Sequence, residues 1–175
     1  MTEQTAERRL RRDDTALAIA GDQQAFCRLA LECERTLYRV SRTVLRSDED
    51  CADAVQEALL KAWRNLGTLR RPEYFRTWLV RIVLNECYSL CRRYRFTAPL
   101  EAADQGVCQD ADGALDLRAA IFALPERLRV AVVLVYVEGF SIEETARTLA
   151  LPQGTVKSRL ARGRAKLAKW IQTEV

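Results

Sequence analysis

The residues best suited to chemistry are cations gathered on one stretch near the C-terminus. Between residues 153 and 173 the chain has six Lys or Arg and no Asp or Glu. Apolar Val156, Leu160 and Leu167 share one side of this stretch, which predicts a helix with a single buried face. Charge of one sign on the other face suits a phosphate backbone. The outward residues are Thr155, Lys157, Ser158, Arg159, Arg162, Arg164, Lys166 and Lys169.

A second, shorter helix must position this one. Ser141 and Glu144 have the spacing of a capping box, which predicts a helix start at Ser141. Ala146 is small, as a residue must be where two helices cross closely, and Pro152 ends the helix by restricting the residue before it. Two short helices joined by a tight turn are the layout of a helix-turn-helix, whose second helix enters the DNA major groove. The alternative is an ordinary solvated basic helix.

A second candidate cluster lies on a predicted helix over about 73–95. Arg81, Asn85, Tyr88 and Arg92 are spaced four, three and four residues apart, beside an apolar face to which we assign Trp78. A polar, aromatic and basic stripe can stack an unpaired base and hold its phosphates. The spacing alone favours a plain solvated face with Tyr88 half-buried.

Composition narrows the fold to an all-α class. The 175 residues are 49% hydrophobic, and seven Gly with four Pro argue against a turn-rich β fold. The six cysteines form no CxxC pair and the chain has no histidine. We therefore expect reduced thiols, no metal site, no cofactor and no enzymatic activity.

Charge is arranged in blocks along the chain. Residues 47–57 carry five acids and no base, residues 61–95 carry nine bases and two acids, and residues 97–117 carry five acids and no base. Such blocks favour separate acidic and basic partner surfaces. The polar N-terminus and a longest apolar run of eight residues, 130–137, predict a cytoplasmic chain without membrane insertion.

The order of the elements predicts two small helical domains. We expect a domain over 13–96, an acidic flexible linker over 97–113 and a helix-turn-helix domain over 114–173. Ser47 should cap the third helix, with Cys51, Val55, Leu59, Ala62 and Trp63 on its inward side. Gly139 should end the helix before Ser141. The predicted helices cover about 14–20, 23–45, 48–65, 73–95, 115–123, 125–138, 141–150 and 153–170.

Four segments form a recognisable series in chain order: residues 53–58 (DAVQEA), 75–85 (FRTWLVRIVLN), 124–129 (LPERLR) and 154–164 (GTVKSRLARGR). Together they resemble the extracytoplasmic-function (group 4) sigma factors of bacterial RNA polymerase. The resemblance covers nearly the whole chain after the first dozen residues. The loop at 69–72 departs from many relatives, since it carries Leu, Arg, Arg and Pro where they place an aromatic and small residues.

The resemblance implies a transcription initiation factor that directs core polymerase to promoters. The first domain would grip the polymerase clamp and would read and help melt the −10 element, and the second would read the −35 element and contact the flap. The partners implied are core polymerase, promoter DNA and an anti-sigma factor. The residues implied are Asp50, Asp53, Gln56 and Glu57 for the clamp; Arg70, Arg71, Arg81, Asn85, Tyr88 and Arg92 for the −10 element, with Asn85 and the loop 69–71 forming a base pocket; and Thr155, Lys157, Ser158, Arg159 and Arg162 for the −35 element.

Two readings from other classes stay open at this point. A stand-alone helix-turn-helix regulator would bind DNA tightly without polymerase and would need a dimer interface. A helical adaptor that senses redox through cysteine would change its partner binding on oxidation, and the lack of paired cysteines counts against it. An enzyme is the poorest reading, because no catalytic constellation is present.

Overall fold

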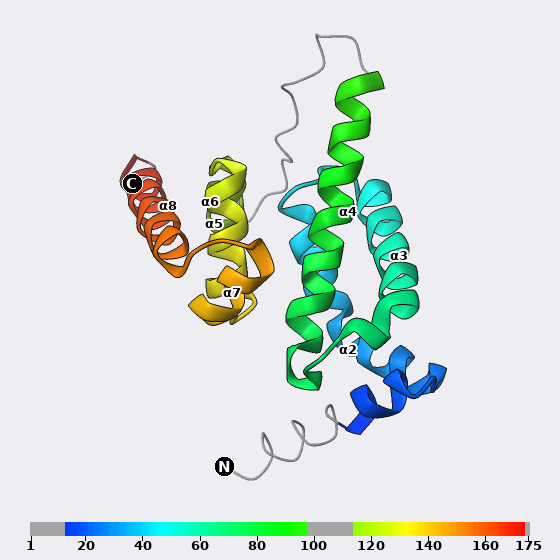
Figure 1. The fold of residues 1–175 in the computed structure, drawn as a ribbon. Coiled ribbons are helices and arrows are strands. Elements are labelled where there is room, and N and C mark those ends of the chain that lie inside the picture. Colours follow the sequence, from blue (N-terminus) through cyan, green and yellow to red (C-terminus); the bar gives the residue numbers. More distant parts are fainter. Residues whose placement is uncertain (1–12, 98–113, 174–175) are drawn as a thin grey trace.

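The computed structural model describes residues 13–97 and 114–173, and every regular element in these ranges is helical. Helix α4 stands in the middle, with α2 and α3 against one side and the C-terminal helices against the other (Figure 1). The all-α prediction is confirmed. The expected linker at 97–113 lies, apart from Thr97, outside the described residues. No helix in the described part of the chain is long and apolar enough to span a membrane.

The helices occur where the pattern predicts them, with shifts of a few residues. A helix over 13–19 comes first. Short 3₁₀ segments, Leu66–Thr68 and Pro72–Tyr74, connect α3 to α4. The longer elements are α2 (Gln23–Arg42), α3 (Asp48–Asn65), α4 (Phe75–Thr97), α5 (Ala114–Ala123), α6 (Glu126–Val132), α7 (Ile142–Leu149) and α8 (Gln153–Thr173).

Side-chain caps fix where the first helices begin. The Asp22 carboxylate accepts hydrogen bonds from the backbone N–H groups of Gln24 and Ala25, at 2.8 and 3.1 Å. Ser47 caps α3 as predicted, by accepting from the N–H of Asp50 at 3.3 Å. Three acids in the first turn of α3 also suit the positive end of the helix dipole.

Helix α3 packs through small residues, which confirms the predicted inward positions of Cys51 and Ala62 and corrects the rest of the predicted stripe. Its buried stripe is Cys51, Ala54, Ala58 and Ala62, so the backbone of α3 approaches its neighbours closely. Val55 and Leu59, predicted to point inward, are half-buried, and Trp63 is 37% exposed. The prediction placed the large apolar residues on the inner face. In the structure the alanines lie there, because α3 crosses α2 and α4 at short range.

The segment between α6 and α7 also differs from expectation. In place of one helix over 125–138, α6 ends at Val132 and a π-helical turn covers Val133–Val137. The N–H of Glu138 donates to the Val133 carbonyl at 2.9 Å. Gly139 then adopts φ +70°, the left-handed stop predicted for it. The wide turn re-aims Glu138, whose side chain is buried.

The helix-turn-helix itself is present. Ser141 and Glu144 form the predicted capping box: the Ser141 Oγ accepts from the N–H of Glu144 at 3.1 Å, and Glu144 accepts from the N–H of Ser141 at 2.8 Å. Ala150 ends α7 in a left-handed conformation, with φ 53°. Val156 and Leu160 of α8 are buried against Leu128 and Val132 of α6.

Gly163 lies where α8 crosses α6. A Cβ placed there would lie 2.7 Å from Cγ2 of Val132, a buried β-branched side chain with little freedom to move. Because no side chain fits there, the Val132 side chain of α6 packs directly against the backbone of α8 at Gly163. The orientation of α8 is thereby tied to α6.

We predict that Gly163→Ala lowers the stability of the C-terminal helices by about 1–2 kcal/mol, because overpacking outweighs the gain in helix propensity. Gly154→Ala is the matched control, since no atom lies within 4 Å of its added Cβ. It should be neutral or slightly stabilising. Denaturant unfolding followed by circular dichroism measures both. Equal midpoints for the two variants would contradict the close crossing.

Candidate nucleic-acid and protein interfaces

The outer face of α8 is open and cationic. Lys157, Ser158 and Arg162 are exposed, while Thr155 and Arg159 are half-buried. The Ser158 hydroxyl donates to the Thr155 carbonyl at 2.9 Å. Because the inner face is fixed by its apolar contacts, these side chains project from a rigid helix, which is what major-groove reading requires.

A second cationic surface lies at the start of α4. Arg70, Arg71 and Arg81 line a cavity of about 510 Å³ together with the rings of Tyr74 and Trp78. The Arg71 guanidinium lies over the Tyr74 ring, 6.0 Å from its centre. Aromatic faces beside arginines are the combination that holds unpaired bases and their phosphates. Trp78 is half-buried and packs against the core, in keeping with its assigned place.

The predicted stripe on α4 divides between two environments. Asn85 and Arg92 are exposed, and Arg92 donates to the Ser89 hydroxyl at 2.9 Å. Asn85 does not line the cavity formed by the loop 69–71, so the structure does not bring the amide and the loop into one pocket.

Tyr88 is half-buried and faces the C-terminal helices. Burial, followed by the nearby Glu126 carboxylate to which its hydroxyl donates, raises its pKa from 10.0 to about 12, while Arg159 acts in the opposite direction. The structure thus confirms the expectation that Tyr88 is half-buried. The side chain is covered by helices of the C-terminal group, which contribute Glu126 and Arg159.

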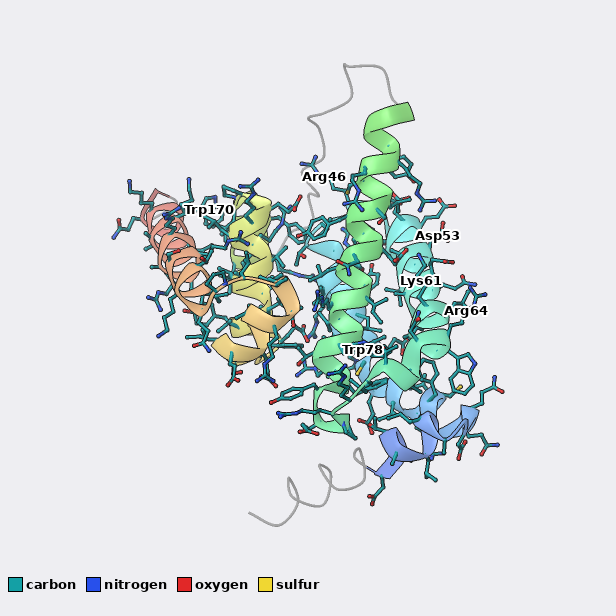
Figure 2. All side chains as sticks on the ribbon, in the orientation of Figure 1. Arg46, Asp53, Lys61, Arg64, Trp78 and Trp170 are labelled. Atoms are coloured by element: carbon teal, nitrogen blue, oxygen red, sulfur yellow. The ribbon has the colours of Figure 1, made fainter. Side chains whose placement is uncertain are left out.

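The acidic block lies on the side of α3 that faces away from α8. Asp53 and Arg64 lie along this side, while Lys61 reaches Glu86 of α4 at 2.6 Å (Figure 2). Asp53, Gln56 and Glu57 are exposed. Asp50 is half-buried and accepts from the Tyr94 hydroxyl at 2.6 Å, which raises the pKa of Tyr94.

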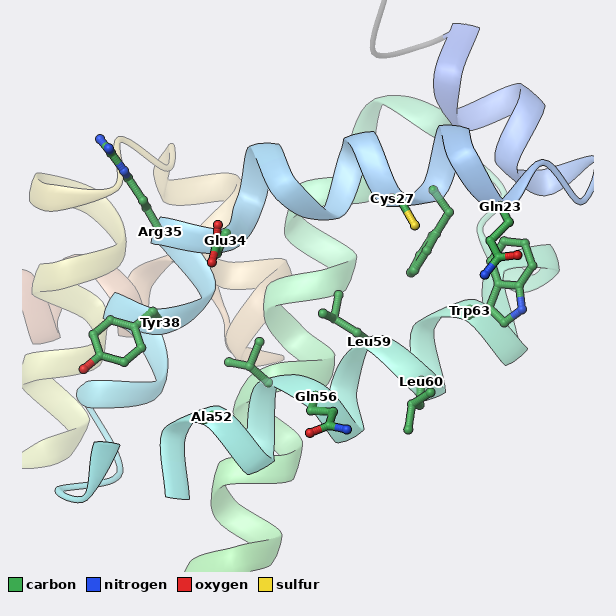
Figure 3. Close-up of a pocket in the computed structure, with 12 residues that line it drawn as sticks. Gln23, Cys27, Glu34, Arg35, Tyr38, Ala52, Gln56, Leu59, Leu60 and Trp63 are labelled. Atoms are coloured by element: carbon green, nitrogen blue, oxygen red, sulfur yellow. The ribbon is translucent and has the colours of Figure 1, made fainter. Parts of the chain in front are cut away.

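Next to these acids is a groove that sequence reasoning missed. It lies between α2 and α3, has a volume of about 740 Å³ and is lined mainly by apolar side chains (Figure 3). Val55, Leu59 and Trp63 form its α3 wall, and Gln56 lines it too. The signal was present in the sequence, because Val55, Leu59 and Trp63 recur every four residues on a different face from the alanines. An apolar groove beside a row of acids suits an amphipathic helix with basic residues.

None of the described cysteines, Cys27, Cys33, Cys51, Cys87 and Cys91, forms a disulfide bond. Burial raises the pKa of Cys87 to about 12, so this thiol stays protonated and packs as a small apolar group. Among the described residues, no cluster of three or more His, Cys, Asp or Glu side chains is arranged to hold a metal ion.

Comparison with known proteins gives matches over both groups of helices. Residues 29–97 match the family model "Sigma-70 region 2", and residues 114–167 match "Sigma-70, region 4". The ECF RNA polymerase sigma factor SigM of Mycobacterium tuberculosis is 42% identical over 160 residues, which cover 88% of this chain and 81% of the relative. The ECF RNA polymerase sigma-E factor of Escherichia coli is 34% identical over 173 residues, covering 87% and 89%.

Two solved structures superpose on most of this chain, so the match includes both the N-terminal and the C-terminal helices. CnrH, in complex with the cytosolic domain of CnrY, superposes with a TM-score of 0.72 at 28% identity, covering 95% of this chain and 99% of CnrH. The sigma factor RpoE of Bartonella quintana, in complex with the anti-sigma factor NepR, gives a TM-score of 0.69 at 26% identity, covering 86% and 98%.

We predict that Tyr88 makes stability fall at alkaline pH. Its pKa is higher in the folded state, so the stabilisation is complete below about pH 10 and is lost as the pH rises through about 12. Between pH 10 and 12 the wild-type chain should therefore lose stability more steeply than Tyr88→Phe. Denaturant midpoints measured from pH 8 to 12 test this. Ionisation of Cys87 also lowers stability in this pH range, but it affects both proteins equally because both keep that thiol. Parallel curves would mean that the hydroxyl is not buried.

Proposed function

Because the chain belongs to the ECF sigma factors, the non-enzymatic subunits that bind bacterial RNA polymerase and direct it to promoters, we propose that its two groups of helices read two promoter elements while α3 holds the polymerase. Matches to region 2 and region 4, in that order, carry this proposal. The domains are residues 13–96 and 114–173, with 97–113 as the linker. The chain works in the cytoplasm, where polymerase and promoters are.

The C-terminal domain binds the −35 element through α8. Lys157, Ser158 and Arg162 are the base-reading residues, since they are exposed on the outer face. Thr155 and Arg159 lie at the half-buried edge of that face and hold phosphates. A good bidentate side-chain contact to a base discriminates by about 1–3 kcal/mol.

The N-terminal domain binds the −10 element through the loop before α4 and the α4 stripe. Arg70, Arg71 and Arg81 hold phosphates around the aromatic cavity, with Arg92 continuing the track. Asn85 offers both a donor and an acceptor to a base edge, and Tyr88 stacks on a base. Because Asn85 lies outside the cavity, the amide and the cavity serve different nucleotides. Capture of unpaired bases offsets an unstacking cost of a few kcal/mol.

The polymerase clamp binds along α3. Asp50, Asp53, Gln56 and Glu57 meet clamp cations, and the groove between α2 and α3 receives the apolar side of a clamp helix. The flap binds the C-terminal domain. Tethering two weak DNA-binding domains to one polymerase makes them bind together through effective concentration. An anti-sigma factor is a further partner, since the matched RpoE structure contains one.

Reconstitution with bacterial core polymerase on a library of promoters tests this function. We expect selective initiation with two enriched motifs at a fixed spacing. Asn85→Ala should lower open-complex formation while core binding stays intact. A stand-alone regulator would instead bind duplex DNA tightly without polymerase and fail to bind core, and that result would overturn the proposal.

The roles assigned on α8 predict two different defects. Arg162→Ala should reduce initiation about 5- to 150-fold at promoters with the preferred base and relax the −35 motif at that position. Arg159→Ala should weaken all promoters alike and reduce the salt dependence of binding by about one unit of slope. Arg127→Ala, an exposed cation on α6, is the matched control. Equal loss of motif preference in Arg159→Ala and Arg162→Ala would contradict the division of roles.

A further inference from the structure

The cavity at the start of α4 gathers four guanidinium groups around two aromatic rings. Its volume of about 510 Å³ lies within the range of small-molecule sites. The cations are Arg70 and Arg71 of the preceding loop, Arg81 of α4 and Arg147 of α7. Among the residues that the structure describes, no Asp or Glu lines this cavity. Four like charges around one concave space repel one another, so the cavity favours an anion with several negative charges.

Arg147 reaches this cavity from the C-terminal group of helices. Its guanidinium lies over the Tyr74 ring at 4.2 Å, and that of Arg71 lies over the same ring at 6.0 Å. Arg147 is also paired with Glu143 one turn earlier, an exposed carboxylate that does not line the cavity. Tyr74 thereby orients two cations from distant parts of the chain, which lowers the cost of ordering them around a ligand.

Buried polar contacts keep the start of α7 beside α4. The Glu138 carboxylate is 3% exposed and accepts from the Thr36 hydroxyl at 2.7 Å and from Arg76 of α4 at 3.3 Å. Arg76 also lies over the Phe140 ring at 4.4 Å, just before α7 begins. The backbone that carries Arg147 is therefore held in place by contacts with the first turn of α4.

The rest of the lining suits an aromatic base and its sugar. Trp78 is half-buried and lies near the start of α4 (Figure 2). Its ring packs against Phe75 with centroids 6.1 Å apart, and its side chain also lines the cavity. Stacking on an aromatic side chain raises affinity about 5- to 150-fold per base. The Thr68 and Thr77 hydroxyls complete the lining and can donate to phosphate or ribose oxygens.

We propose that this cavity binds a free nucleotide with two or more phosphates, which contact the four arginines while the base stacks on Trp78. A DNA strand carries one phosphate charge per nucleotide. A nucleoside triphosphate concentrates several charges within the space of one cavity, which matches the four cations better. Guanidinium groups are well suited to this task, because they bind phosphate oxygens through two parallel hydrogen bonds.

This inference goes beyond the proposed function, which assigns Arg70, Arg71 and Arg81 to −10 phosphates and gives Arg147 no role. Under that function α7 belongs to the domain that reads the other promoter element. The cavity with all four arginines therefore belongs to the free chain. A bound nucleotide occupies three of the arginines that contact the −10 element, so nucleotide and promoter DNA compete for them.

The test titrates the free full-length chain with ATP and GTP by isothermal titration calorimetry, in about 0.15 M salt, where diffuse surface attraction is screened. AMP, GMP, tripolyphosphate and guanosine are the matched probes, because each lacks either phosphates or the base. Each should bind about tenfold more weakly than the triphosphates, or weaker still, since it loses charged hydrogen bonds or a stacked base. Hydrogen exchange over residues 68–81 and 142–149 should slow when ATP or GTP is added.

Two variants locate the site. Arg147→Ala should weaken ATP and GTP binding about tenfold, the effect of losing a hydrogen-bonded charge. Tyr74→Leu should weaken it in the same direction, because the ring orients Arg71 and Arg147. Arg127→Ala, an exposed cation on α6 that does not line the cavity, removes the same charge and should leave the affinity unchanged.

Three outcomes would overturn the inference. Equal losses in Arg127→Ala and Arg147→Ala would mean attraction to the whole cationic surface. Equal affinities for tripolyphosphate and ATP would mean an anion site without a base contact. A single-stranded oligonucleotide that binds more tightly than ATP, with the same dependence on Arg147, would make the cavity a DNA site. No arm contains polymerase or promoter, so failure of the proposed function in reconstitution would leave these results as they stand.

Discussion

A carboxylate removed from water must be met by hydrogen-bond donors or cations, and in this protein Glu138 meets that condition across the boundary between domains. The wide π turn at Val133–Val137 presents the carboxylate, and Thr36 with Arg76 receives it. Each domain therefore carries polar groups whose satisfaction depends on the other. The position of α7 over the start of α4, and of α8 beside Tyr88, follows from where this contact is made. In this structure the C-terminal helices of the sigma factor therefore pack beside α4 in a compact arrangement (Figure 1).

A second constraint acts inside the N-terminal domain. Helix α3 turns its alanines toward α2 and α4, so its larger apolar side chains are left at the rim. That single choice of inner face produces two features of the outer side of α3. Val55, Leu59 and Trp63 border the groove, and the acids lie beside it. Close packing and the groove are two outcomes of one residue pattern.

Local chemistry could be predicted from the sequence wherever it is complete within a few residues. The capping box at Ser141, the cap at Ser47 and the left-handed Gly139 need only their neighbours, and all three are confirmed. The predicted inner face of α3 was confirmed at Cys51 and Ala62 and was wrong at Trp63, which is exposed. Side-chain size suggested one stripe, and the helix crossing distance selected the alanines. The π turn was missed because the apolar pattern of residues 130–137 is compatible with several helical windings. The cover over Tyr88 depends on Glu126 and Arg159, which no local pattern connects to α4.

The crossing at Gly163 also bears on how promoter preference can change over evolutionary time. Val132 meets the backbone of α8 near its middle, so the tilt of that helix is set by its inner face. Substitutions on the outer face leave this tilt as it is. Under the base-reading roles proposed for Lys157, Ser158 and Arg162, a lineage of such proteins can therefore change its set of target genes without passing through poorly folded intermediates. Inner-face and outer-face residues of the same helix are free to evolve at different rates.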